Sequence, residues 1–197
     1  MAYPKITMES TNPYNGLDWL VARDEGLFEK EGLEVEFVKH AGPIRKTDVS
    51  ITDWNKVSSS AGHASTMELG GANIFNACEW GNYRRAQDTD VGLRQLGRRA
   101  GVPCGAIVVR PDSDVYTPQQ LANKTIAVPF HAGTHYLTLQ LLEGFVPDDE
   151  VKLVSSGLPG ERFRSMMSGE VDACSVREPW NTVAEKAGCR VIVQGWY

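Results

Sequence analysis

One predicted turn, His131-Ala132-Gly133-Thr134-His135, combines two imidazoles, a hydroxyl and backbone N–H groups at the start of a predicted helix. Free N–H groups at a helix N-terminus favour anions or carbonyl oxygens. The i, i+4 spacing of the two histidines is also typical of two metal ligands on one helix face. No Glu lies within that spacing, as it does in the H-E-x-x-H motif. We therefore expect a ligand contact or a capping interaction from His131 and His135, and no bound metal.

A second candidate is the pair Cys78-Glu79, which follows a predicted strand and precedes a predicted helix. With His63 upstream, these residues could supply a nucleophile, a carboxylate and a base. A position beside a helix start favours the thiolate form of a cysteine and therefore its reactivity. An inert Cys78 is the alternative, because no family signature surrounds it. Catalysis by Cys78, Glu79 and His63 is expected only if the protein is an enzyme.

The composition excludes several classes of protein. The chain has 197 residues, with a hydrophobic fraction of 42% and a charged fraction of 23%, which is ordinary for a globular protein. The net charge is −5 and there is no basic stripe with interleaved aromatics, so we expect no nucleic-acid partner. The four cysteines lack C-x-x-C spacing, which argues against structural zinc and a disulfide framework. Cys104, Cys174 and Cys189 are expected to be buried apolar side chains.

The second half of the chain alternates strands and helices. Thr117 and Gln120 form a predicted capping box for a short helix. Strands that alternate with helices in this way indicate parallel βαβ units. The strands are predicted at 124–128, 151–154, 171–176 and 189–193, and the helices at 134–145, after 160 and at 180–187.

The first half repeats this theme less regularly. Strands are predicted at 5–8, 33–37 and 72–77, with a helix at 17–30 and another that begins near Asn82. Glycine and proline flank a further predicted strand within residues 101–110. Such a segment suits a hinge that joins two lobes.

Ligands of open parallel sheets bind beyond the carboxyl ends of the strands. Tyr14, Trp80 and Trp180 lie on loops of this kind, and each could stack on a planar ligand or pack in the core. The sequence leaves both possibilities open. The candidate ligand-binding residues on these loops are Tyr14, Asn15, His40, Asn76, Cys78, Glu79, Trp80, His131, Gly133, Thr134, His135, Glu178 and Trp180.

Several motifs along the chain resemble those of one family. They are NGLDWL at 15–20, EGLFEKEGLEV at 25–35, LANKTIAV at 121–128, SGEVDA at 168–173 and EPW at 178–180. These segments resemble the type 2 periplasmic-binding-protein-like family, which includes nitrate, sulfonate and taurine substrate-binding proteins and thiamine-pyrimidine synthases. The match runs along almost the whole chain. Such motifs specify the fold better than the ligand.

The resemblance implies an α/β, two-lobe type 2 periplasmic-binding-like fold with mostly parallel sheets. The lobes are expected at residues 1–108 and 109–193, with 194–197 as the start of the return crossover. In the family the chain then returns to the first lobe. We therefore expect this fold to lack its C-terminal return segment, and a second chain is a candidate partner that would complete the first lobe.

The resemblance also implies a clamp that closes on a small anionic or heteroaromatic solute, as in the substrate-binding protein of an ABC transporter, with a permease as partner. The alternative is a cytoplasmic hydrolase, desulfinase or decarboxylase on the same fold, using Cys78, Glu79 and a histidine. Only one cysteine stands where the pyrimidine synthases have a cysteine-rich motif, so we expect no cofactor. The N-terminus has no signal-peptide pattern, which favours the cytoplasm slightly over the periplasm.

Overall fold

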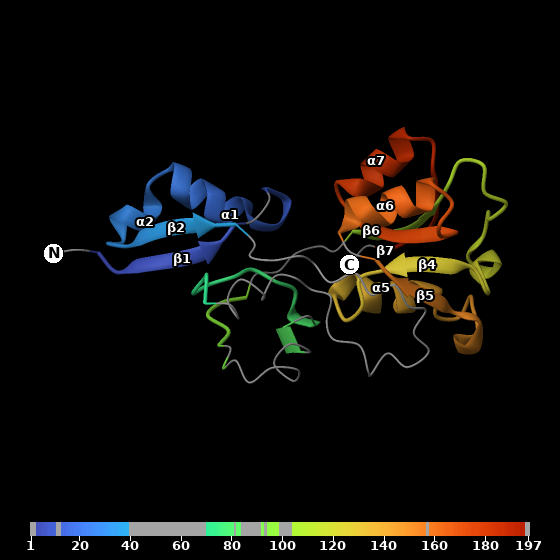
Figure 1. Cartoon of the computed structure of the whole chain (residues 1–197), viewed down its shortest axis with the longest axis horizontal. Coiled ribbons are helices and arrows are strands. Elements are labelled where there is room, and N and C mark those ends of the chain that lie inside the picture. The colour runs from blue at the N-terminus through green and yellow to red at the C-terminus, as the bar shows by residue number, and fades with distance from the viewer. Residues whose placement is uncertain are drawn as a thin grey trace.

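The computed structural model describes residues 3–10, 13–39, 70–80, 82–83, 92, 94–98, 104–156 and 158–195, with only the backbone at 13–15. These residues form two units (Figure 1). The N-terminal unit has a two-stranded sheet, and the C-terminal unit has a five-stranded sheet covered by helices. Of the helices in these residues, none has the length and apolar character needed to cross a membrane.

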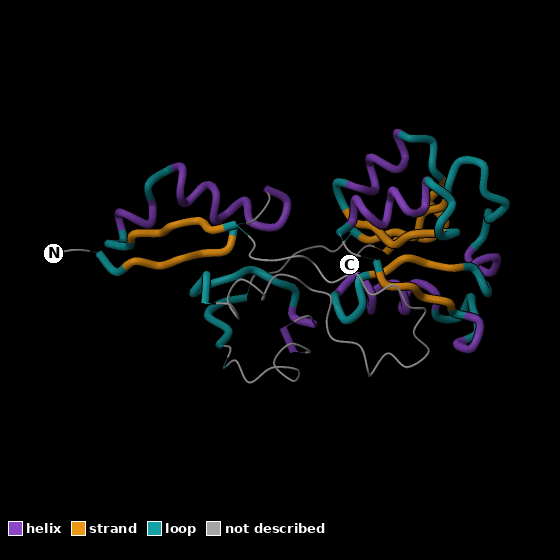
Figure 2. The backbone as a smooth tube through the Cα atoms, viewed as in Figure 1, coloured by secondary structure: helices purple, strands orange, loops and turns teal. Residues whose placement is uncertain are grey.

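The N-terminal unit begins with a parallel strand pair. The strands are β1 (Lys5–Glu9) and β2 (Glu34–Val38). Two helices connect them, α1 (Pro13–Asp24) and α2 (Leu27–Lys30), and both lie along one side of the strands (Figure 2). They replace the single helix predicted here because Gly26, at φ 62°, has the left-handed conformation that interrupts a helix.

Residues 72–77 do not form the predicted third strand. Within this segment, strand pairing is limited to one bridge between Met8 and Ile74. The side-chain oxygen of Asn73 accepts hydrogen bonds from the backbone N–H and the hydroxyl of Thr7, at 3.0 and 2.9 Å. Such side-chain bonds compete with a regular ladder. The segment therefore lies beside β1 as a loop and not as a strand.

The C-terminal sheet has the strand order β5-β4-β6-β3-β7. β4 is parallel to β5 and to β6, whereas β3 is antiparallel to both of its neighbours. The sheet is thus mostly parallel, as predicted, with one reversed strand. The strands are β3 (Gly105–Val109), β4 (Thr125–Val128), β5 (Lys152–Ser155), β6 (Ala173–Arg177) and β7 (Arg190–Gly195).

The segment expected to act as a hinge contains β3. This strand is hydrogen-bonded on both sides, to β6 and β7, and all of its residues are buried. A strand held in this way is part of a rigid sheet, and a lobe boundary between 108 and 109 would cut it. The second unit therefore starts before Gly105. Residues 101–103 lie outside the described part of the chain, and the division into two moving lobes stays a prediction.

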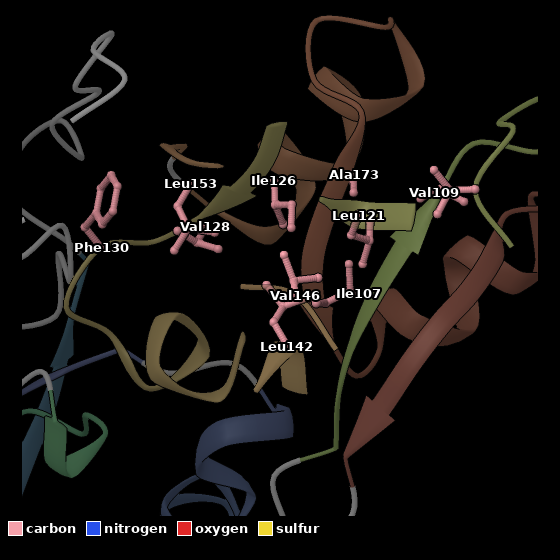
Figure 3. Close-up of a cluster of buried hydrophobic side chains, with 11 residues drawn as sticks. Ile107, Val109, Leu121, Ile126, Val128, Phe130, Leu142, Val146, Leu153 and Ala173 are labelled. Atoms are coloured by element: carbon pink, nitrogen blue, oxygen red, sulfur yellow. The ribbon is translucent and has the colours of Figure 1, made fainter. Parts of the chain in front are cut away.

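Helices cover both faces of the C-terminal sheet (Figure 1). α5 (Gly133–Leu142) lies on one face, and α6 (Pro159–Met167) and α7 (Trp180–Lys186) lie on the other. Side chains of β3 alternate between the two faces. The core on the α5 side is drawn in Figure 3 and consists of Ile107, Val109, Val115, Leu121, Ile126, Val128, Phe130, Leu142, Val146, Leu153 and Ala173.

The core on the α6 side contains sulfur. Cys174 and Cys189 are buried there with Met166, while Cys104 is buried at the start of β3. All three cysteines are free. Their burial as small apolar side chains is confirmed.

Two short 3-10 segments, Pro118–Leu121 and Asp148–Glu150, complete this unit. At the first of them Gln120 accepts a hydrogen bond from the N–H of Thr117 at 3.0 Å. This is the glutamine half of the predicted capping box. The sequence signal therefore identified a helical turn before β4, although this turn is a 3-10 segment, which is wound more tightly than an α-helix.

Gly105 marks a close approach between β3 and α5. A Cβ at this position would overlap Cδ2 of the buried Leu137. We expect Gly105→Ala to lower the free energy of unfolding by about 1–3 kcal/mol through overpacking, as measured by urea denaturation. Gly97→Ala is the matched control, because a Cβ there meets nothing within 4 Å. Wild-type stability of the Gly105 variant would contradict the close packing.

Candidate functional site

The loop between β4 and α5 contains most of the predicted site residues. β4 ends at Val128, and α5 begins at Gly133 after an extended Ala132. Ala132 makes no side-chain cap, and the first turn of α5 has no acidic residue. Backbone N–H groups at such a helix start favour negative charge.

His131 and His135 shape this loop. The backbone N–H of His131, which has a left-handed conformation with φ 59°, donates to Nδ1 of His135 at 3.1 Å. Nδ1 of His131 lies 3.3 Å from the hydroxyl of Tyr136. Within the described ranges there is no group of three or more His, Cys, Asp or Glu placed to hold a metal ion. The bond that Nδ1 of His135 accepts from the backbone of His131 holds the turn in place.

His135 is neutral at pH 7. Its exposed fraction is 1%, and its ring lies edge-on to Phe130 with the centroids 5.1 Å apart. Burial lowers its pKa to about 4, and the charge of His131 acts in the same direction. A neutral ring whose Nδ1 accepts a hydrogen bond has its proton assigned to Nε2. His135 thus brings no positive charge to a ligand.

A loop of the N-terminal unit contacts the start of α5. The N–H of Gly133 donates to Sγ of Cys78 at 3.3 Å, and the rings of Trp80 and Tyr136 lie 4.9 Å apart. Trp80 is 55% exposed, so much of its indole stays open to solvent. Predicted site residues that are far apart in the sequence are therefore side by side here.

Glu79 is engaged within its own unit. Its carboxylate accepts from the hydroxyl of Tyr83 at 2.8 Å and pairs with Arg98 at 3.1 Å. These partners occupy the carboxylate that the catalytic hypothesis assigned to act with Cys78. His63, the third member of that hypothesis, lies outside the described residues.

The other N-terminal candidates are less completely described. Tyr14 and Asn15 lie in the first turn of α1, where only the backbone is described, and His40 lies outside the described residues. Asn76 is half-buried on the loop that leads to Trp80. This loop contacts the C-terminal unit at the start of α5.

The candidates after β6 mostly make local contacts. The carboxylate of Glu178 accepts from the N–H and the hydroxyl of Thr182, at 3.3 and 2.9 Å, and so caps the start of α7. The ring of Trp180 lies 5.6 Å from that of Phe163, and a Cβ at Gly160 would be 2.7 Å from its indole. Trp180, the first residue of α7, is therefore packed against α6.

Sequence reasoning missed three ionisable residues near strand ends. Glu9 and Arg177 are the last residues of β1 and β6, and Arg162 of α6 is 2% exposed. A charged residue at the end of an apolar strand is a signal that could have identified Glu9 and Arg177. Nothing in the sequence separates the buried Arg162 from the exposed Arg164 nearby.

Comparisons with known proteins agree with this fold. Residues 109–195 match the NMT1-like family. The structure is similar to the alkanesulfonate-binding protein SsuA from Xanthomonas axonopodis pv. citri bound to MOPS, with a TM-score of 0.67 and 17% identity over 99% of this chain and 61% of that one. The fold is that of the type 2 periplasmic-binding-protein-like family.

Further solved structures share this fold. The periplasmic aliphatic sulphonate binding protein SsuA from Escherichia coli gives a TM-score of 0.64 with 16% identity, over 99% of this chain and 57% of that one. An ancestral arginine-binding protein bound to arginine gives 0.58 with 17% identity, over 100% and 80%. The chain thus spans less than two thirds of either SsuA. A search of curated protein sequences gives no match. Since sulfonate- and arginine-binding proteins share this periplasmic-binding-like fold, the fold alone does not fix the ligand.

Glu9 makes the stability of this periplasmic-binding-like fold depend on pH. The side chain is 3% exposed, and burial raises its pKa from 4.5 to about 8. Because the folded-state pKa is the higher one, the stability that the protonated form gives is complete below pH 4.5 and is lost as the pH rises through 8.

We expect Glu9→Gln, which cannot ionise, to be more stable than the wild type at pH 8 but not at pH 4.5. The difference in unfolding free energy between Glu9→Gln and the wild type should grow by about 2 kcal/mol or more from pH 4.5 to pH 8, as measured by urea denaturation. Glu34→Gln, at an exposed position of the neighbouring β2, is the control and should show no such trend. A pH-independent difference for Glu9→Gln would show that this carboxyl is not buried.

Proposed function

We propose that this chain binds a small anionic or heteroaromatic solute between its two units, as the substrate-binding protein of an ABC-type transporter. The observation that supports this most directly is the meeting of Cys78 and Trp80 with the start of α5. This meeting lies beyond the carboxyl end of β4, which is where parallel sheets bind ligands.

The groups at this meeting suit such a solute. Trp80 and Tyr136 offer aromatic surface to a planar or partly apolar body. The uncapped start of α5 favours an acceptor or a negative group. Neutral His135 adds no charge, so the backbone N–H dipoles at the start of α5 favour a negative group here without help from this imidazole.

The proposed location and partners follow the same family. The periplasmic aliphatic sulphonate binding protein of similar fold supports the periplasm as one location. A similar structure described as belonging to a putative sulfonate ABC transporter supports delivery to a permease as the role. We also propose that further polypeptide completes the N-terminal unit. The apolar side chains of Leu17 and Val21 on α1 are 58% and 45% exposed, which is unusual for a pair at i, i+4 in a finished domain.

A catalytic alternative rests on one observation, the hydrogen bond from Gly133 N–H to the sulfur of Cys78. Such a bond stabilises negative charge on sulfur. The engagement of Glu79 by Tyr83 and Arg98 counts against it, because that carboxylate is then not poised to act with the thiol. Binding without turnover therefore stands as the better proposal.

Trp80 provides a test of the binding site. We expect Trp80→Ala to weaken solute binding about tenfold, because a stacked aromatic contributes roughly 1 kcal/mol beyond its buried area. Isothermal titration calorimetry with alkanesulfonates, carboxylates and heteroaromatic acids would measure this. Phe145→Ala, which removes a 43% exposed aromatic beyond the other end of α5, is the matched control and should bind normally. A wild-type protein that binds no small solute would contradict the proposed function.

Cys78 distinguishes binding from catalysis. We expect Cys78→Ala to keep solute affinity within about threefold, since the Gly133 N–H can donate to the ligand or to water instead. Mass spectrometry of each bound solute after long incubation should show it unchanged with both wild type and variant. Product formation by the wild type that disappears in Cys78→Ala would establish the enzyme and displace the transporter role.

A further inference from the structure

Four sulfur atoms form two contacts at the C-terminal end of α6, away from the site described above. Met166 and Met167 are the last two residues of this helix. The S–H of Cys174 donates to Sδ of Met166 at 3.7 Å. The S–H of Cys189 donates to Sδ of Met167 at 3.5 Å. Cys174 and Met166 are both 0% exposed, whereas Met167 is 39% exposed, so the second contact lies at the surface.

Met167 lies against a cavity at the end of α6. The cavity has a volume of about 480 Å³ and is lined by Arg110, Pro111, Asp112, Met167, Ser168 and Gly169. Val109, the last residue of β3, pairs with Ala173, the first residue of β6. The cavity is therefore at the edge of the sheet opposite to the one where β4 and β6 end. A small reagent in water can reach Met167 without passing the loops of the candidate site.

Of these four sulfur atoms, the thioether of Met167 is the one that an oxidant can attack. Oxidation of a cysteine proceeds through its thiolate. Burial raises the pKa of the Cys189 thiol, and it raises the pKa of Cys174 to about 12, so both stay protonated at pH 7. A thioether has no proton to lose, and its oxidation follows its exposure. Met166 is fully buried, which leaves Met167.

The contact with Cys189 also sets the direction of attack. A thioether sulfur has two lone pairs, and the S–H of Cys189 is directed at the sulfur of Met167 from one side. A reagent in the cavity can then use only the other lone pair. Because oxidation makes the sulfur a chiral centre, attack from one side gives one of the two sulfoxide epimers in excess.

Arg110 can hold the oxygen atom that oxidation adds. Its Nε donates to the carboxylate of Asp112 at 3.1 Å, and its Nη1 donates to the carbonyl of Met166 at 3.3 Å. Within the described part of the chain, its Nη2 makes no hydrogen bond. A guanidinium N–H that lines the same cavity is a strong donor, and a sulfoxide oxygen is a far better acceptor than a thioether.

We propose that Met167 is a modification site, which peroxides oxidise selectively to one epimer of methionine sulfoxide. The open lone pair of the sulfur attacks one oxygen of hydrogen peroxide, so that an S–O bond forms and the O–O bond breaks. The hydroxide that leaves takes up the proton of the transferred oxygen and departs as water. The sulfur is oxidised by two electrons and the peroxide is reduced by two. This site is separate from the solute loops and does not depend on the proposed function.

Peptide mapping of the folded full chain tests the selectivity. After treatment with hydrogen peroxide at pH 7, trypsin releases residues 165–177 as one peptide, which contains both Met166 and Met167. We expect tandem mass spectrometry to show Met167 oxidised at least about tenfold faster than Met166 or Met8, which are 0% and 6% exposed. The same treatment in urea should remove the difference. Equal rates in the folded chain would overturn the proposal.

Methionine sulfoxide reductases A and B each reduce one epimer, so they test the direction of attack. Applied to the digested peptides of the wild type, they should show one epimer of Met167 sulfoxide in excess by at least about fivefold. Cys189→Ala should lower this excess toward parity, whereas Cys189→Ser, which keeps a hydrogen-bond donor, should retain part of it.

Cys104→Ala is the matched control. Cys104 is 8% exposed, as Cys189 is, but it lies just before β3 at the opposite edge of the sheet. This variant should give the epimer ratio of the wild type, and circular dichroism melting would confirm that each variant is folded. Equal amounts of the two epimers from the wild type, or an excess that Cys189→Ala leaves unchanged, would contradict the proposed site.

Discussion

The candidate site depends on the parallel pairing of β4 with both of its neighbours. Thr125–Val128 lies opposite Lys152–Ser155 on one side and pairs with Ala173 and Cys174 on the other. Because the three strands run the same way, their carboxyl ends share one edge of the sheet. This edge therefore brings together the start of α5, the residues after β5 and the last residue of β6. The reversed β3 lies between β6 and the edge strand β7, and all of its residues are buried.

The sequence was most informative where backbone pairing and apolar pattern agreed. The runs around Ile126 and Val108 are continuous and apolar, as strands buried on both faces must be, and helices with one apolar face separate them. Each element there could be predicted within a few residues. In the N-terminal unit two features depart from the pattern: the side chain of Asn73 bonds to Thr7 where a regular ladder is predicted, and Gly26 divides a helix. A pattern of apolar residues does not show which polar side chain will compete with the backbone.

The site was predictable as a set of loops but not as a set of contacts. The rule for parallel sheets identified the turn at 131–135 and the loop at Cys78, and the structure brings them together. Their contact joins residues 55 positions apart, which spacing alone cannot indicate. Burial of Arg162 depends on a carbonyl of β6 and another after β5, so it emerges only from the folded sheet. The sequence leaves Trp180 either on a ligand or in the core, and the close approach of Gly160 places its ring against α6.

Both units have a buried ionisable group at or near a strand end, and the two respond differently to burial. Glu9 can become neutral by taking up a proton, and its pKa of about 8 shows that it does so near neutral pH. Arg162 cannot, because even a pKa of about 10 leaves it charged at pH 7. Its guanidinium instead donates to the carbonyls of Ser175 and Ser156, which lie at the carboxyl ends of β6 and β5 and stabilise the buried charge.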